Sequence, residues 1–153
     1  DYFLTAYPLF STTYHLFSTA CTQIRELTLA DPYGGDNGAA LFFTVREKGK
    51  YYNIYKKDNP FSAAMSQKTS GKNYNRTPCF NPATGKLAFS CKQDGVSSAD
   101  LYVIDVDGNN LTQLTINKSY DGQPYWTTDG YIYFVSDRGN DAGNYQIWRF
   151  KYE

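Results

Sequence analysis

Short apolar runs recur along the chain, and each is flanked by residues that favour turns. Three of these runs end in Phe, at 41–43, 87–89 and 132–134, and they contain no polar residue. A half-exposed strand alternates apolar and polar residues, whereas a strand covered on both faces is apolar almost throughout. Long stripes with a 3.6-residue period are absent. The pattern therefore predicts an all-β fold in which short strands are packed on both sides.

The apolar runs belong to a repeat of 46 residues. Pro32, Pro78 and Pro124 each precede a turn and then one of the runs. Farther along, each unit carries a polar–aliphatic–aromatic triplet, found at 53–55, 100–102 and 146–148. Four short strands in each unit of about 45 residues are the sequence signature of a propeller blade. We therefore predict a β-propeller built from four-stranded antiparallel blades.

The strands of one blade are called a to d in chain order. In the middle unit they are predicted at 77–80, 86–91, 100–105 and 110–115. Residues 1–28 resemble strands b, c and d of an opening blade. We predict one β-propeller domain over 1–153, with the opening blade at 1–28, two blades at 32–75 and 78–115, and strands a to c of a last blade at 124–150. The chain would then form a partial or half ring of about three and a half blades.

The two ends of this predicted array leave unpaired blade edges. The opening blade lacks strand a and the last blade lacks strand d, and open edges invite pairing with another chain. Three arrangements fit the sequence: part of a longer propeller, two copies paired into one ring, or a small ring with irregular closure. The second arrangement implies self-association through the open blade edges.

The middle and last units also carry a family resemblance. The matching segments are 77–82, 85–90, 100–105, 114–115, 124–126, 129–130, 132–139 and 146–148. They resemble the TolB-type, WD40-like repeat, in which Pro-x-Trp-Ser-Pro-Asp-Gly precedes Ile-Ala-Phe-x-Ser-Asp, Ile-Tyr-x-x-Asp and Leu-Thr. The resemblance is strong over 77–150, weaker over 22–76 and weakest over 1–21. The Ser-Pro-Asp-Gly turn is intact in no unit, although the turns keep their Gly.

The resemblance implies a function. TolB-type propellers are binding proteins, so it implies a non-catalytic protein-binding scaffold of the bacterial cell envelope, either periplasmic or secreted. The partner would be an envelope protein, a glycan or a peptidoglycan-associated lipoprotein. One alternative is a carbohydrate-binding or glycan-processing accessory propeller. Another is the propeller domain of a prolyl-oligopeptidase-like peptidase whose hydrolase domain lies outside these residues.

Motifs for catalysis, metals and cofactors are missing from the sequence. His15 is the only His, there is no Gly-x-Ser-x-Gly elbow, and no phosphate-binding loop is present. The three cysteines, Cys21, Cys79 and Cys91, have no metal or redox spacing. The segment 105–109 lacks the Gly and Glu that a calcium loop of the EF-hand type requires. We therefore expect no enzyme activity and assign no cofactor or metal ligand, while metal binding in Asp-rich turns such as 137–141 stays open.

Charge and hydropathy give no indication of nucleic acid as a partner or of a membrane span. The chain has 15 basic and 15 acidic residues, so no basic excess points to nucleic acid. No apolar run approaches the roughly 20 residues of a membrane span. The first residues do not form a signal peptide, and we expect the chain to be processed or part of a longer one.

Blade geometry predicts where a partner binds. Because successive strands reverse direction, the b–c loops and d–a connections emerge at one rim, and these are the longer connections, which usually carry function. Tyr74 and Tyr120 each lie four residues before a repeat Pro, and Tyr and Arg are favoured in interfaces. The predicted contact residues are Tyr74, Asn75, Arg76, Lys118, Tyr120, Asp121, Asp137, Arg138, Asn140 and Asn144. The other interpretation of the two tyrosines is packing between blades or capping of the rim.

Overall fold

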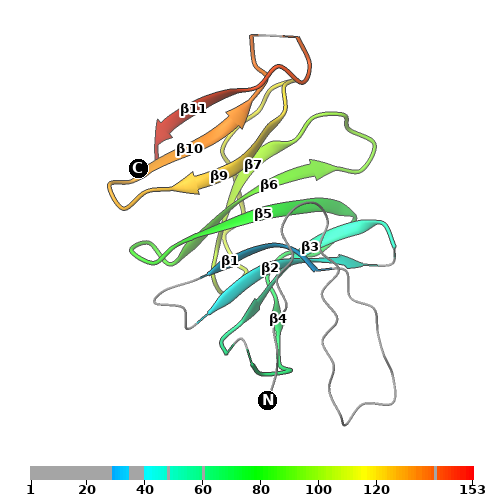
Figure 1. The fold of residues 1–153 in the computed structure, drawn as a ribbon, viewed down its shortest axis with the longest axis vertical. Helices are drawn as coiled ribbons and strands as arrows, with labels where there is room; N and C mark the ends of the chain where they lie inside the picture. Colours follow the sequence, from blue (N-terminus) through cyan, green and yellow to red (C-terminus); the bar gives the residue numbers. More distant parts are fainter. Residues whose placement is uncertain (1–28, 35–39, 48, 60, 140) are drawn as a thin grey trace, which may run out of the picture.

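The computed structural model describes residues 29–34, 40–47, 49–59, 61–139 and 141–153, and in this part of the chain every regular element is a β-strand. Three blades follow one another along the chain (Figure 1). The first blade contains β1 (Leu29–Gly34), β2 (Leu41–Glu47), β3 (Tyr51–Lys57) and β4 (Ser66–Gln67). The second contains β5 (Asn73–Asn81), β6 (Lys86–Gln93), β7 (Asp100–Asp105) and β8 (Thr112–Gln113). The third contains β9 (Asp121–Trp126), β10 (Tyr131–Ser136) and β11 (Gln146–Lys151).

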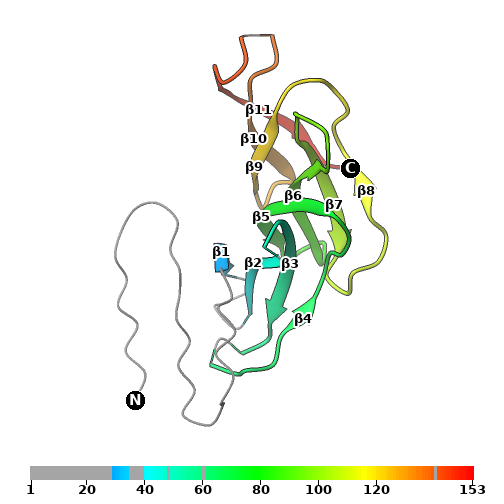
Figure 2. The same ribbon diagram turned by 90° about the vertical axis from the view of Figure 1, so that its right-hand side faces the viewer.

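Neighbouring strands within a blade pair in antiparallel fashion. The first and second blades are joined by one parallel pair, Tyr52 with Tyr74, whereas the third blade is a separate three-stranded sheet. Figure 2 shows the short β4 and β8 together on one side of the molecule, with β1 on the other. The predicted all-β, partial propeller is therefore confirmed, and the described residues form no closed ring. The predicted opening blade, 1–28, lies outside the described residues.

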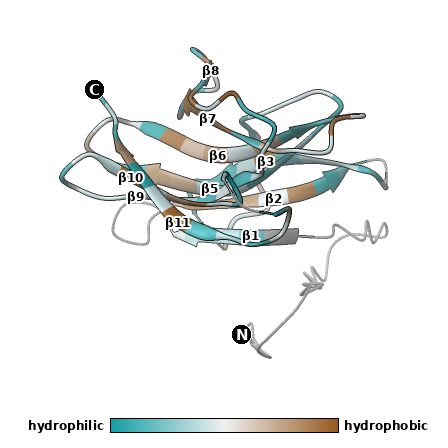
Figure 3. Ribbon diagram, turned by 90° about the horizontal axis from the view of Figure 1, so that it is seen from above, coloured by the Kyte–Doolittle hydropathy of each residue, from teal (hydrophilic) through white to brown (hydrophobic). Residues whose placement is uncertain are grey.

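The core consists of two layers, one between each pair of neighbouring blades. Leu87 and Phe89 of β6 face the first blade, where they join the buried Phe42 and Ile54. Ala88, between them in sequence, faces the third blade and joins a second cluster that includes Leu101, Val103, Trp126, Ile132 and Phe134. Strand β6 is thus covered on both faces, as its continuous apolar sequence predicted. In Figure 3 the hydrophobic stretches lie mainly along the strands.

The outer face of the third blade has no covering layer in the described residues. Ile54, Leu101 and Ile147 occupy the same position in strand c of the three blades. Ile54 and Leu101 are fully buried against the following blade, whereas Ile147 is 79% exposed. Tyr125 of β9 is exposed as well. The outer face of the third blade is therefore equivalent, by the repeat, to the faces of the first and second blades that the following blade covers.

Each strand a contains an irregularity before its Pro. Asp31, Thr77 and Gln123 precede the three repeat prolines, and all have positive φ, between 51° and 53°. The register with strand b shifts at the same place in every blade. Positive φ is uncommon for residues other than Gly, and a residue before Pro normally has an extended backbone. A β-bulge is thus built into strand a of each described blade.

The strand pairing places the connections at two ends of the blades. The first residue of β5, Asn73, pairs with the last residue of β6, Gln93. Likewise Asp121 begins β9 and pairs with Ser136 at the end of β10. The b–c loops and d–a connections therefore emerge together, at an end called here the loop-rich rim. The a–b and c–d turns form the opposite end, called the turn rim.

Candidate functional site

Five tyrosines lie along the loop-rich rim, and we call them the tyrosine row: Tyr51, Tyr52, Tyr74, Tyr120 and Tyr145. The ring centroid of Tyr74 lies 5.9 Å from that of Tyr51 and 6.3 Å from that of Tyr52. On the third blade, Tyr120 and Tyr145 meet edge to face at 5.5 Å. Such pairs are a favourable aromatic geometry. The row spans all three blades.

Cations lie over the rings of three of these tyrosines. The Lys50 ammonium is 5.0 Å from the ring centroid of Tyr51, and the Lys92 ammonium is 5.9 Å from that of Tyr74. The Arg76 guanidinium is 5.0 Å from the ring centroid of Tyr52. These distances are within the range of cation–π attraction. The interactions hold the positive charges in place at the rim.

Two carboxylates bind cations of this group. Asp31, in the first bulge, accepts hydrogen bonds from Arg76 Nε at 2.9 Å and Nη2 at 3.2 Å, and also from the Thr77 N–H of the next bulge. Burial alone would lower the pKa of Arg76, but the hydrogen bonds and charge of Asp31 raise it overall. Asp94 pairs with Lys50 and accepts a hydrogen bond from the Tyr51 hydroxyl at 2.8 Å. These hydrogen bonds lower the pKa of Asp94.

Tyr120 is held close to the backbone of its own strand. A Cβ added to Gly122 would overlap the hydroxyl end of the Tyr120 ring. Burial raises the pKa of Tyr120, and the neighbouring Tyr145 adds to this. Gly122 occupies the position that Arg76 holds in the second blade, 46 residues earlier. The absence of a side chain at Gly122 thus makes room for the tyrosine.

Beneath the row, a hydrogen-bonded cluster joins the first and second blades at what we call the first junction. Thr69 Oγ1 accepts from the Ile54 N–H at 2.8 Å and donates to Asn53 Oδ1 at 3.1 Å. Asn75 Nδ2 donates to the same oxygen at 2.9 Å. Asn75 is 3% exposed. This predicted contact residue therefore positions the rim from below.

The second junction, between the second and third blades, uses equivalent positions with charged side chains. Thr115 Oγ1 accepts from the Leu101 N–H at 2.9 Å and donates to Asp100. Asn117 donates its backbone N–H to Asp100 and its Nδ2 to Asp121 Oδ2, the latter at 2.8 Å. Asp121 is fully buried, and its Oδ1 has no hydrogen-bond donor among the described residues. Burial raises the pKa of Asp100, partly offset by these hydrogen bonds.

Asp137 and Arg138 connect the second junction to the b–c loop of the third blade. Arg138 Nη2 lies 2.5 Å from Asp121 Oδ2, and its guanidinium lies over the rings of Phe134 and Trp148. The buried Asp137 accepts from the Tyr120 N–H at 2.7 Å and from the Gly143 N–H at 3.1 Å. Both predicted residues therefore order the loops beside Tyr120.

The remaining predicted residues differ in exposure. Lys118 and Asn144 are exposed at the loop-rich rim, and Asn140 lies outside the described residues. Tyr74 and Tyr120 are half-buried, so the structure combines packing at the rim with partial exposure. Tyr51, Tyr52 and Tyr145 were not predicted from the sequence. All three lie where a b–c loop meets strand c, and their position there could have indicated that they lie at the loop-rich rim.

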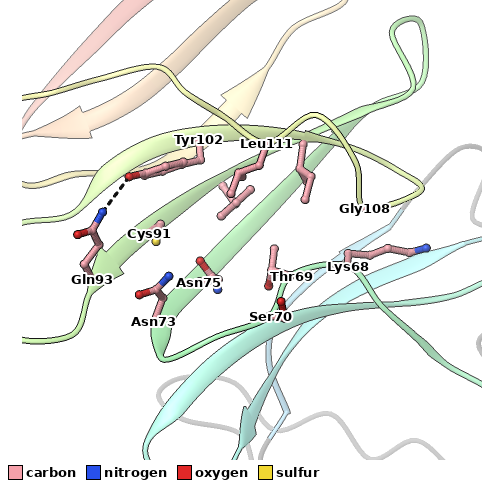
Figure 4. Close-up of a pocket in the computed structure, with 12 residues that line it drawn as sticks. Lys68, Thr69, Ser70, Asn73, Asn75, Cys91, Gln93, Tyr102, Gly108 and Leu111 are labelled. Carbon is pink, nitrogen blue, oxygen red and sulfur yellow. Dashed lines mark hydrogen bonds between the residues drawn. The ribbon is translucent and has the colours of Figure 1, made fainter.

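A hollow of about 260 Å³ lies between the first and second blades (Figure 4). Its apolar wall is formed by Phe89, Cys91 and Leu111. One side of the hollow is lined by the polar side chains of Asn73 and Asn75. Gln93 Nε2 lies 3.4 Å from the Tyr102 hydroxyl at its end. Burial raises the pKa of Cys91 to about 11, with a smaller contribution from Asp100, so its thiol is protonated at neutral pH.

A second hollow, of about 310 Å³, lies at the turn rim between Tyr33, Phe80, Tyr125 and Trp126. No set of three or more His, Cys, Asp or Glu side chains in the described ranges is arranged to hold a metal ion. In the same ranges we find no helix with the length and apolarity that crossing a membrane requires.

Comparison with solved structures shows the same fold in longer proteins. The putative TolB from Agrobacterium tumefaciens is 26% identical, with a TM-score of 0.61 over 75% of this chain and 39% of its own. TolB from Acinetobacter baumannii is 22% identical, with a TM-score of 0.70 over 83% of this chain and 30% of its own. Kuenenia stuttgartiensis hydrazine synthase is 20% identical, with a TM-score of 0.68 over 81% of this chain and 24% of its own.

The chain thus spans less than two fifths of the length of each of these proteins. At these identities, the likeness to the Acinetobacter protein and to hydrazine synthase shows the fold alone. The sequence model of the TolB beta propeller domain matches residues 21–153. That match takes in all three described blades with their repeat prolines and inter-blade clusters, and so this chain belongs to the TolB β-propeller family.

Proposed function

We propose that this propeller is a non-catalytic protein-binding scaffold of the bacterial cell envelope, periplasmic or secreted, and that its partner docks on the loop-rich rim. The observation that carries the proposal is the tyrosine row with its ordered cations. Tyrosine and arginine are the residues that most often anchor protein interfaces. Membership of the TolB family supports a protein-interaction role.

Within the proposed interface, the predicted residues take two roles. Tyr74, Arg76, Lys118, Tyr120 and Asn144 have exposed atoms and would contact the partner. Asn75, Asp121, Asp137 and Arg138 would hold the rim in shape through the junctions and the b–c loop. A rim ordered in advance binds with a smaller entropic penalty than a flexible one.

Site-specific photo-cross-linking tests this proposal. A benzophenone amino acid is placed at Lys118 or Asn144 on the loop-rich rim, and at Thr128 on the turn rim as the matched control. All three side chains are exposed, so the substitution leaves the fold intact. In bacterial envelope extract, the two rim positions should yield a discrete protein adduct that position 128 does not.

The adduct should disappear when Tyr74→Ala and Tyr120→Ala are introduced together. Because both rings are half-buried, circular dichroism and thermal unfolding must first show that the double variant is folded. The milder Tyr74→Phe, Tyr120→Phe pair keeps the packing and should retain most of the adduct. An adduct that forms equally at position 128, or that survives the double Ala substitution in a folded protein, contradicts the proposal.

A further inference from the structure

The loop-rich rim carries more positive than negative charge at its surface. Asp31 and Asp94 are already paired with Arg76 and Lys50. Lys72 and Lys118 are exposed on the d–a connections, and Lys92 lies over Tyr74. Within the described ranges none of these three lysines makes an ion pair. Asp141, on the b–c loop of the third blade, is a further exposed carboxylate of this rim, but the exposed Lys50, Lys72, Arg76 and Lys118 outnumber the exposed Asp94 and Asp141.

Arg76 can bind a further carboxylate at the centre of the rim. Its Nε and Nη2 donate to Asp31, and no hydrogen bond from Nη1 is found among the described residues. The side chain is 44% exposed. A guanidinium has two edges that each match a carboxylate, so the Nη1 side remains suited to a second one.

The tyrosine faces are poorly placed for stacking on nucleic acid bases. Single-stranded nucleic acid is held by aromatic faces that bases can reach. Here cations cover faces of Tyr51, Tyr52 and Tyr74, and the three rings also pack against one another. On these three tyrosines, the ring edges and the neighbouring ammonium groups are more open to a partner than the ring faces. These groups suit peptide carboxylates better than bases.

We infer that the partner segment bound by the tyrosine row is acidic, a stretch of polypeptide with several Asp or Glu side chains. The inference rests on the proposed function and adds the chemistry of the partner. The carboxylates contact Arg76, Lys72, Lys92 and Lys118, and the backbone of the segment lies across the tyrosine edges. Charge complementarity of this kind raises the association rate and selects the partner.

Fluorescence anisotropy with labelled twelve-residue peptides tests the inference. One peptide alternates Glu and Gly, the second has Gln in place of Glu, and the third has Lys. The Glu peptide should bind at least about tenfold more tightly than the Gln peptide in about 50 mM NaCl, and the difference should shrink severalfold in about 500 mM NaCl, because salt screens charges at a surface. The Lys peptide should not bind.

Charge reversal identifies the surface. Lys72→Glu and Lys118→Glu should each weaken Glu-peptide binding about three- to fivefold. The matched control is Lys151→Glu at the turn rim, which should leave binding unchanged. All three lysines are exposed, so the thermal unfolding transition of each variant should match that of the parent.

Three outcomes overturn the inference. The Gln peptide binds as tightly as the Glu peptide, or a single-stranded oligonucleotide binds more tightly than the Glu peptide. The third outcome is that the Glu peptide does not bind up to about 1 mM, which corresponds to a binding free energy of about −4 kcal/mol. The proposed function fails separately, if the cross-linked envelope partner does not depend on Tyr74 and Tyr120. A partner that cross-links at the rim while the Glu and Gln peptides bind equally leaves the scaffold proposal standing and removes only the acidic chemistry.

Discussion

The two inter-blade junctions have the same framework but different charge. Both use a Thr of the d segment, Thr69 or Thr115, which accepts from a strand c backbone N–H. In the first junction the other partners are the amides of Asn53 and Asn75. In the second, carboxylates take both of these positions, and Asn117 and Arg138 supply the donors.

This difference shows that the same repeat can form either an uncharged junction or a charged one that depends on a rim loop. The amide junction is complete within two blades and contains no titratable side chain. The carboxylate junction needs a cation, and Arg138 brings it from the b–c loop of the third blade. Burying a carboxylate is costly unless it is paired, so the second junction depends on the order of a rim loop. Of the two junctions that the structure describes, only the second thus links a rim loop to the buried residues between blades.

The apolar parts of the two junctions should respond alike, and this is the largest expected effect. Leu101→Ala and Ile54→Ala remove fully buried side chains at equivalent positions. Each should lower the free energy of unfolding by about 2–5 kcal/mol, measured by urea denaturation. Ile147→Ala, at the exposed equivalent, should change it by less than about 0.5 kcal/mol. A large loss from Ile147→Ala would show that its face is covered in solution.

The polar parts should respond differently. Arg138→Leu leaves the buried Asp121 carboxylate without its cation and should lower the free energy of unfolding by about 2–3 kcal/mol. Adding Asp121→Asn, which copies the amide of the first junction, should restore at least half of the loss. Urea denaturation of the single and double variants measures both effects. If the double variant is no more stable than Arg138→Leu, the charge difference between the junctions is irrelevant to stability.

A substitution at Gly122 tests how closely Tyr120 is packed at the rim above the second junction. Gly122→Ala forces Tyr120 away from its place and should lower the free energy of unfolding by about 1–2 kcal/mol, because the overlap must be relieved. The near-ultraviolet circular dichroism of the tyrosines should change as well. Gly34→Ala is the control, since a Cβ there meets nothing within 4 Å. Equal effects of the two substitutions would disprove the close packing of Tyr120.

The smallest effect concerns pH. The folded-state pKa of Asp100 is raised by burial, so protonated Asp100 favours the folded state. Its stabilising contribution is therefore complete below the ordinary aspartate pKa and is lost as pH rises through the folded-state value. Asp100→Asn should gain about 0.5 kcal/mol relative to the parent between pH 3 and pH 7. Asn53→Asp introduces a carboxyl group at the first junction and should therefore lose stability relative to the parent over the same pH range. If the stability of the parent and of Asp100→Asn changes with pH in parallel, the explanation is wrong.

The fold was predictable because its signals are local and repeated. Continuous apolar runs, regularly spaced prolines and Gly-containing turns specified the strands of the second blade to within a few residues. The bulges were not predictable, since Asp31, Thr77 and Gln123 precede Pro and would ordinarily have an extended backbone.

The site was predicted only in part. Sequence position placed Asn75 and Asp121 beside the rim loops, but it did not show that the neighbouring blade buries them. Tyr51, Tyr52 and Tyr145 were missed because the predicted contacts were taken from the d–a connections and from residues 137–144 of the last b–c loop, and not from the residues just before strand c. Their exposure depends on how adjacent blades are offset, which is a property of packing between segments distant in sequence.

The stacking of blades has a consequence for how the molecule loses structure. Each blade is packed on its sequence neighbours, so cooperativity passes along a line, as in other repeat proteins. The second blade is enclosed by two junctions, whereas the third is held by the second junction at one face. Amide protons of β10 and β11 should therefore exchange with solvent before those of β6 and β7. Among the described residues, the third blade should therefore open before the second, and the part of the rim around Tyr120 would be lost while the part around Tyr74 was still in place.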